Sequence, residues 1–144
     1  MNKIDYMLEA IKEAKKSIKY GDVPVGAVIV KDGEIIAKAH NKREQKKETI
    51  AHAEILAITK ANNVVGDFRL DGCDIYITKE PCLMCMGAIL SSRIRKIYYG
   101  ARDRRFGTES LARENNFNHK CGVEGDILGE ECEKLLTNFF KSIR

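Results

Sequence analysis

Apolar residues recur at helical spacing near both ends of the chain. Over residues 4–20 they repeat every three or four positions, and Gly21 ends the pattern. Such a repeat predicts an amphipathic first helix. Leucine and phenylalanine at the same spacing predict a last amphipathic helix over residues 128–143.

The segment between these helices shows shorter, strand-like patterns. Residues 25–30 are apolar and largely β-branched, and the tight-turn sequence Lys-Asp-Gly-Glu leads into a second apolar run at 35–37. This pattern predicts a β-hairpin that ends near Asn41. A polar loop over 42–48 should follow. Beyond it we expect a helix over 51–61, a strand over 73–78, a helix over 82–90, a strand over 94–99, a long loop with room for a helical turn over 100–118, and a short strand over 121–125.

A hairpin followed by strands that alternate with helices is typical of an α/β protein. The 144 residues contain no repeat, low-complexity tract or linker, and this length is usual for one domain. We therefore expect residues 1–144 to form a single domain. The hydrophobic fraction of 44% and the charged fraction of 32% are those of an ordinary soluble protein.

Charge and cysteine content indicate which kinds of partner and which cellular compartment to expect. The net charge of +4 permits a polyanionic partner without requiring one. No apolar run approaches the roughly 20 residues that span a bilayer, and the N-terminus lacks the order of a signal peptide. The five cysteines are an odd number, which favours a reducing compartment over a disulfide framework. We expect a cytoplasmic protein without membrane contact.

Two short motifs carry the candidate chemistry: His52-Ala53-Glu54, and Pro81-Cys82-Leu83-Met84-Cys85. One imidazole and two thiols, from His52, Cys82 and Cys85, would fill three positions of a tetrahedral zinc ion and leave the fourth to water. Zinc lowers the pKa of such a water to about 7. Glu54 lies two residues from His52 and could act on that water as a general acid and base. We expect one zinc ion per chain.

Each motif also has a simpler interpretation. A C-x-x-C pair can be a redox site, but that interpretation gives no role to the His-Ala-Glu triplet. A structural zinc would need a fourth protein ligand, and neither His40 nor His119 supplies one convincingly. Glu54 could be an ordinary acidic residue in the first turn of a helix. The catalytic site with three ligands explains more of the pattern.

H-x-E followed by P-C-x-x-C is the signature of zinc-dependent nucleobase deaminases. Beyond that motif, the chain resembles the bacterial tRNA-specific adenosine deaminases over nearly its whole length. The resembling segments, in chain order, are Val23-Pro24-Val25-Gly26-Ala27-Val28, Ala51-His52-Ala53-Glu54-Ile55, Glu80-Pro81-Cys82-Leu83-Met84-Cys85, Gly100-Ala101-Arg102-Asp103, Asn118-His119 and Phe139-Phe140.

This resemblance implies a three-layer α/β/α sandwich, similar to cytidine deaminase, around a mixed sheet of about five strands. It also implies a homodimer that converts adenosine to inosine at the wobble position of tRNA, within the anticodon stem-loop. Asn41 would hydrogen-bond the flipped base, and Asp103 would line the entrance for the anticodon loop. Phe139 and Phe140 would close the pocket. The basic cluster that includes Arg104 and Arg105 would meet phosphates.

The chain departs from this family pattern between Asp103 and Asn118. The segment is several residues shorter than the family's glycine-rich stretch, and Arg104-Arg105-Phe106 stands where smaller residues are common. Two other functions therefore remain as hypotheses. One is a deaminase of free guanine or cytosine, which would need no basic rim. The other is a non-catalytic zinc module that binds nucleic acid, which would not need Glu54.

Overall fold

A computed structural model describes residues 1–114 and 119–143 of the chain. Asn118, part of one resembling segment, lies outside these residues, as does the end of the shortened 103–118 stretch. In chain order the described elements are α1 (Lys3–Ile18), β1 (Gly26–Lys31), β2 (Glu34–His40), α2 (Arg43–Lys46), α3 (Ala53–Val65), β3 (Cys73–Lys79), α4 (Leu83–Ser91), β4 (Lys96–Ala101), α5 (Glu109–Glu114), β5 (Gly122–Glu124) and α6 (Gly129–Ser142).

The strands form one mixed sheet in the order β2-β1-β3-β4-β5. Strand β1 is antiparallel to both β2 and β3, whereas β3, β4 and β5 are parallel to one another. The predicted hairpin joins β1 to β2. At its turn Asp32 and Gly33 have φ angles of 50° and 80°, the backbone that the Asp-Gly sequence favours.

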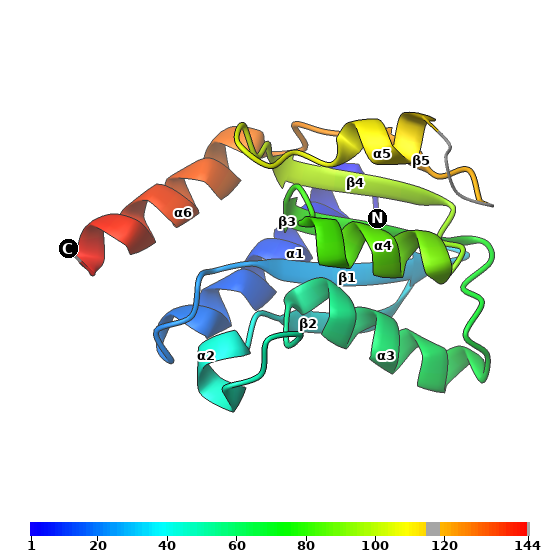
Figure 1. Cartoon of the computed structure of the whole chain (residues 1–144), viewed down its shortest axis with the longest axis horizontal. Coiled ribbons are helices and arrows are strands. Elements are labelled where there is room, and N and C mark those ends of the chain that lie inside the picture. The colour runs from blue at the N-terminus through cyan, green and yellow to red at the C-terminus, as the bar shows by residue number, and fades with distance from the viewer. Residues whose placement is uncertain (115–118, 144) are drawn as a thin grey trace.

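Helices cover both faces of the sheet, so the molecule has three layers. Helices α3, α4 and α5 lie in front of the sheet in Figure 1, and α1 lies behind it. Alternate residues of β1 show the same division. Ala27 and Ile29 join the hydrophobic cluster under α3 and α4, while Val28 and Val30 join a second cluster with Tyr6 and other residues of α1. The predicted α/β/α sandwich is confirmed.

Helix α1 lies unusually close to the start of β1 because Gly26 has no side chain. A Cβ atom placed on Gly26 would lie 1.9 Å from the carbonyl oxygen of Ala10 and 2.6 Å from the amide nitrogen of Ala14. Only glycine fits at this crossing. The helix itself begins with a capping box in which Asn2 and Asp5 exchange side-chain and backbone hydrogen bonds.

Two segments that the sequence pattern assigned to loops contain short helices. Helix α2 lies in the predicted 42–48 loop, and α5 is the helical turn for which the 100–118 loop had room. The buried carboxylate of Asp22 accepts hydrogen bonds from the backbone N–H groups of Glu44 and Gln45, at the beginning of α2. A cap supplied from 22 residues away leaves no local sequence signal.

The topology brings the ends of two strands and the beginnings of two helices together along one side of the sheet, the edge at which the parallel strands end. Strands β3 and β4 are parallel and end at this edge, and helices α3 and α4 begin there side by side. In open α/β sheets, ligands bind outside the carboxyl ends of the strands.

Within the described residues, no helix has both the length and the apolar character needed to cross a membrane.

Candidate metal centre and its pocket

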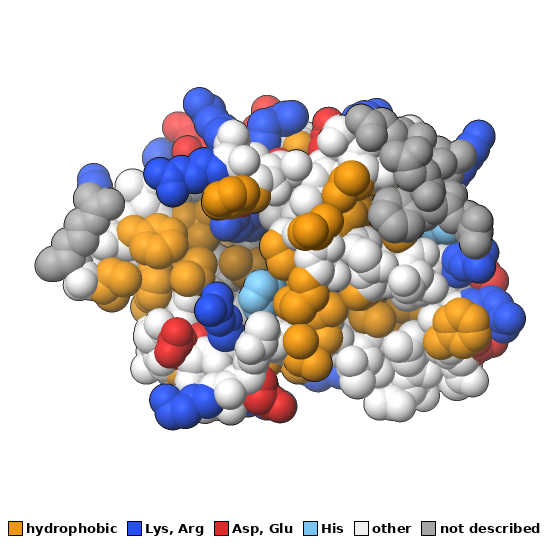
Figure 2. All heavy atoms as spheres, in the orientation of Figure 1, with side chains coloured by type: hydrophobic (Ala, Val, Ile, Leu, Met, Phe, Trp, Pro, Cys, Tyr) orange, Lys and Arg blue, Asp and Glu red, His pale blue; other side chains and the backbone are white. Residues whose placement is uncertain are grey.

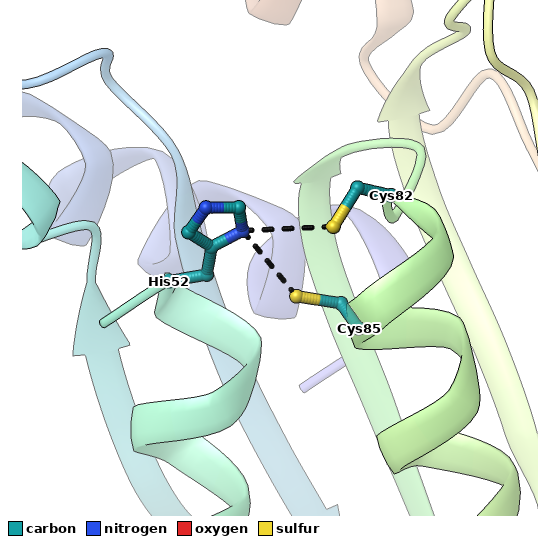
Figure 3. Close-up of side chains that lie close together, drawn as sticks. All are labelled: His52, Cys82 and Cys85. Atoms are coloured by element: carbon teal, nitrogen blue, oxygen red, sulfur yellow. Dashed lines mark hydrogen bonds between the residues drawn. The ribbon is translucent and has the colours of Figure 1, made fainter. Parts of the chain in front are cut away.

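The three predicted metal ligands all lie where a helix begins. His52 is the N-cap residue of α3, Cys82 is the N-cap residue of α4, and Cys85 lies in the first turn of α4. Figure 3 shows the imidazole ring and the two sulfur atoms pointing toward one another across the gap between these helices. Helix N-termini carry positive partial charge, which favours thiolate over thiol.

The spacing of the donor atoms fits a tetrahedral zinc ion. His52 Nδ1 lies 3.6 Å from Cys82 Sγ and 3.5 Å from Cys85 Sγ, and the three donor atoms lie within 4.8 Å of one another. A tetrahedral ion with ordinary Zn–N and Zn–S bond lengths places nitrogen and sulfur about 3.6 Å apart. Among the residues that the structure describes, this cluster has the donor set that zinc prefers, and it leaves one coordination position without a protein ligand.

Hydrogen bonds among the three side chains shift their pKa values. Hydrogen bonds from Cys85 and then from His52 lower the pKa of the Cys82 thiol to about 3. The hydrogen bond with Cys82 raises the pKa of His52. The same sulfur–sulfur hydrogen bond, followed by burial, raises the pKa of the Cys85 thiol. A bound zinc ion would displace the remaining protons, because zinc binds thiolates and neutral imidazole.

A cavity of about 340 Å³ opens beside the ligands. Its volume is within the usual range for small-molecule sites. Figure 2 shows the corresponding hollow, with a histidine side chain at its edge and hydrophobic and basic side chains around it. Glu54 lines the cavity with a side chain that is 4% exposed, and burial raises the pKa of its carboxyl group. A raised pKa suits a residue that must both accept and donate a proton.

Asn41 lies in the same cavity wall, at the end of β2. Its Nδ2 donates to the carbonyl oxygen of Val23 at 3.1 Å, and its Oδ1 accepts from the N–H of Arg43, also at 3.1 Å. Asn41 is 8% exposed. These two bonds fix the plane of the amide and leave it one further N–H and one further lone pair for a ligand.

Phe139 and Phe140 reach the cavity from α6. The first part of this helix packs on β4, and its remainder extends beyond the sheet (Figure 1). The two rings meet edge to face with their centroids 5.4 Å apart, Phe139 buried and Phe140 42% exposed. Both residues line the pocket.

Asp103 lines the pocket at the end of β4, but the two arginines that follow it do not. The Asp103 carboxylate accepts hydrogen bonds from the N–H groups of Arg105 and Phe106, and it lies 3.6 Å from Lys79 Nζ. The hydrogen bond from Phe106 is the largest cause of the lowered pKa of Asp103. Arg104 and Arg105 are exposed on the turn outside the cavity.

Glu80 is the main residue whose role the sequence patterns did not predict. Its carboxylate is buried and accepts three backbone hydrogen bonds, from Asp103 at 2.9 Å, Thr108 at 2.8 Å and Glu109 at 3.0 Å. It thereby fastens the 103–109 segment to the chain just before Cys82. In the sequence, Glu80 is distinguished only by its place directly before the Pro-Cys pair. That place does not reveal which backbone N–H groups its carboxylate accepts.

Comparison with known proteins identifies the family. The family described as the cytidine and deoxycytidylate deaminase zinc-binding region matches residues 1–101, which include the three predicted metal ligands and Glu54. The chain belongs to this deaminase family. It is therefore a zinc-dependent deaminase, a hydrolase, and the interpretation as a non-catalytic zinc module is not supported.

Relatives of this deaminase have been named by substrate. It is 48% identical to the tRNA-specific adenosine deaminase of Bacillus subtilis (strain 168), over 96% of this chain and 89% of that protein. It resembles a solved tRNA:A34 deaminase with a TM-score of 0.87 and 36% identity, over 92% of this chain and 99% of the other. It also resembles a guanine deaminase from Bacillus subtilis, with a TM-score of 0.67 and 39% identity over 81% and 71% of the two chains.

Proposed function

We propose that this deaminase converts adenosine to inosine at the wobble position of tRNA, acting on the anticodon stem-loop. The observation that carries the proposal is the near full-length agreement with proteins of that name, at 48% identity to the Bacillus subtilis enzyme. The described fold also superposes on almost the whole of a tRNA:A34 deaminase, with a TM-score of 0.87.

In this proposal Glu54 moves the protons of the reaction. Zinc held by His52, Cys82 and Cys85 supplies Lewis-acid activation of water at neutral pH. Glu54 takes one proton from the attacking water and delivers it to the ring nitrogen beside C6 of adenine. It then assists proton transfer to the departing amine, so that one water is consumed and one ammonia is released. Its burial beside the metal ligands supports this role.

The other pocket residues would bind and orient the nucleotide. The remaining hydrogen-bonding capacity of Asn41 suits the edge of an extruded base, and Phe139 with Phe140 would exclude water around it. Asp103 would line the entrance for the anticodon loop. Arg104 and Arg105, exposed beside that entrance, would meet phosphates and supply the salt-dependent part of binding.

The proposal includes a symmetric homodimer in the cytoplasm. The dimer follows from the family resemblance, and the five cysteines, all free in the structure, match a reducing compartment. Sedimentation at micromolar concentration should give about twice the 16.3 kDa mass of one chain. A mass near that of a single chain would contradict the dimer.

Deamination of free guanine is a second candidate, because the similar guanine deaminase shares 39% identity with this chain. The match to the guanine deaminase has the lower TM-score and covers 71% of that protein, whereas the match to the tRNA:A34 deaminase covers 99% of that protein. This difference favours the tRNA substrate. A free base also gives no role to exposed arginines beside the pocket.

The deciding experiment offers both kinds of substrate to the zinc-loaded protein. One reaction contains a tRNA with adenosine at the wobble position, and parallel reactions contain free adenine, guanine or cytosine. We expect inosine at the wobble position, read by nucleoside analysis, and little product from the free bases. Efficient deamination of guanine without inosine in the tRNA would establish the second candidate instead.

A further inference from the structure

Phe106 is the most exposed of the large hydrophobic residues that the structure describes. Its side chain is 72% exposed, at the tip of the turn that follows Asp103. Single exposed apolar residues are common on protein surfaces, so the significance of Phe106 depends on its neighbours and its position. The neighbouring turn residues, Arg104 and Arg105, are exposed as well. The turn therefore carries one exposed aromatic residue directly after two exposed cationic residues.

The backbone under this ring is held firmly. The Asp103 carboxylate accepts the N–H groups of Arg105 and Phe106, each at 3.0 Å. The N–H of Asp103 in turn donates to the buried carboxylate of Glu80 at 2.9 Å. Glu80 stands two residues before the metal ligand Cys82. A short series of hydrogen bonds thus fixes the position of the Phe106 backbone relative to the metal centre.

The location of the turn restricts what the ring can meet. Asp103 lines the pocket, and Phe106 follows it by three residues, so the ring lies beside the pocket entrance rather than inside it. Arg102, Arg104 and Arg105 give the surroundings a positive charge, although Arg102 lies 4.0 Å from Glu109. A flat apolar ring among arginines complements a nucleotide, which offers a flat base and an anionic phosphate.

We propose that the Phe106 ring is a stacking platform for an unpaired base of the RNA next to the base that enters the pocket. The inference rests on the proposed tRNA function and adds a contact to it. When the target nucleotide is extruded, its neighbours lose a stacking partner. The ring replaces that partner outside the pocket, and so it acts on RNA binding rather than on the chemical step.

Four variants test the proposal on an anticodon stem-loop with adenosine at the wobble position. Phe106→Ala and Phe106→Leu remove the aromatic ring, and Phe106→Trp and Phe106→Tyr retain one. Aromatic stacking of one base corresponds to about a 5- to 150-fold change in affinity. We expect Ala and Leu to raise Kd and KM by that factor with kcat within about twofold, and we expect Trp and Tyr to stay near the wild type.

Phe68→Ala is the matched control. Phe68 is also an exposed phenylalanine, 58% exposed, with Arg69 stacked on its ring at 4.6 Å, but it lies in the connection between α3 and β3, outside the pocket lining. Its truncation should leave Kd and KM unchanged. Stem-loops with an abasic site at each position beside the target locate the contact. If the missing base is the one that stacks, the abasic RNA should bind the wild type weakly. The wild type and Phe106→Ala should then bind this RNA with the same Kd.

The outcomes separate this inference from the proposed function. Suppose that the wild type makes inosine in the stem-loop. If Phe106→Ala then has the KM of the wild type, or if Phe106→Leu does, the stacking contact is wrong and the proposed function stands. If the wild type makes no inosine, the proposed function fails and the contact fails with it. A sedimentation mass that falls in Phe106→Ala would instead make Phe106 a subunit contact and overturn the proposal.

Discussion

At the scale of single residues, the metal centre depends on where each ligand stands in its helix. An N-cap residue has extended backbone, and His52 and Cys82 have ψ angles of 153° and 173°. Their side chains can therefore turn back over the helix ends and meet. Cys85, one turn into α4, presents its sulfur on the same face. The three donor atoms therefore meet while each of the three residues keeps an ordinary extended or helical backbone conformation.

The first prediction concerns metal retention. Cys82→Ala or Cys85→Ala should lose tight zinc binding, because two ligands hold the ion far less well than three. Metal analysis of the purified variants checks this. Cys73→Ala is the control, since this buried thiol lies at the start of β3, outside the candidate ligand cluster, and its loss should leave the zinc content unchanged. Full zinc content in both ligand variants would rule out the assignment.

The second prediction separates proton transfer from metal binding. Glu54→Gln keeps the size of the side chain but cannot carry the proton, so kcat should fall by about 10²- to 10⁴-fold. Zinc content and thermal unfolding should stay near those of the wild type. Glu44→Gln, a carboxylate on the exposed rim of the same pocket, should retain kcat. Near-normal turnover in Glu54→Gln would exclude the proposed role.

At the scale of elements, the pocket is assembled by segments that hold one another in place. Glu80 joins the end of β3 to the 103–109 segment, and the Thr108 hydroxyl donates to the carbonyl oxygen of Pro81 at 2.6 Å. Asp22 holds the beginning of α2 beside Asn41 in a similar way. In both cases a buried carboxylate satisfies backbone N–H groups of a distant segment.

The third prediction tests the Glu80 anchor. Glu80→Gln replaces one of the two accepting oxygens with an NH2 group that cannot accept, so at least one of the three hydrogen bonds is lost and the free energy of unfolding should fall by about 1–3 kcal/mol. Hydrogen exchange at the amides of Asp103, Thr108 and Glu109 should become faster. Glu13→Gln is the control: this buried carboxylate pairs with the half-exposed Lys16 and makes none of the three hydrogen bonds, so exchange at the three amides should stay unchanged. Unchanged exchange would show that Glu80 is not the anchor.

The fourth prediction compares two glycines. Gly26→Ala should destabilise the protein by about 1–3 kcal/mol or more, because its Cβ would overlap the backbone of α1. Gly87→Ala, within α4, has nothing within 4 Å of the added Cβ and should stabilise the protein by about 0.5–1 kcal/mol. Urea unfolding measures both. A destabilising Gly87→Ala together with a neutral Gly26→Ala would contradict the packing described here.

At the scale of the whole molecule, the mixed sheet decides where the site lies. The change from antiparallel to parallel pairing at β3 brings the ends of β3 and β4 and the beginnings of α3 and α4 to one edge. Helix α6 extends past that edge, and its Phe139 lines the pocket. The pocket therefore collects side chains from the first quarter of the chain to its last helix.

The fifth prediction concerns the stability of the whole fold against acid. Burial lowers the pKa of His40 below 6.5, with the charges of Glu13, Lys16 and Lys42 nearby. A lowered pKa means that the unfolded chain binds the proton more readily, so this contribution is complete above pH 6.5 and is lost as the pH falls below it. Between pH 7.5 and 5.5 the free energy of unfolding should therefore change less favourably in the wild type than in His40→Gln, which lacks this contribution. Equal slopes in urea titrations would contradict this.

The sequence alone determined the local elements and the chemical class of the site. Periodicity predicted the amphipathic helices, the Asp-Gly turn predicted the hairpin, and the spacing within the two motifs placed a histidine and two cysteines at helix beginnings. These are short-range properties, because backbone preference and side-chain periodicity act over a few residues. The resemblance added the layered fold, which the structure confirms.

Only the tertiary structure decided which distant groups meet. The 3.5–3.6 Å spacing of His52 from the two sulfurs spans 30 and 33 residues of chain, and the three hydrogen bonds to Glu80 span 23 to 29. Such contacts depend on how strands pair and helices pack, which no local pattern encodes. The exposure of Phe106 is of the same kind. Its neighbours in sequence could not show that Phe106 follows a residue of the pocket wall and is exposed to solvent.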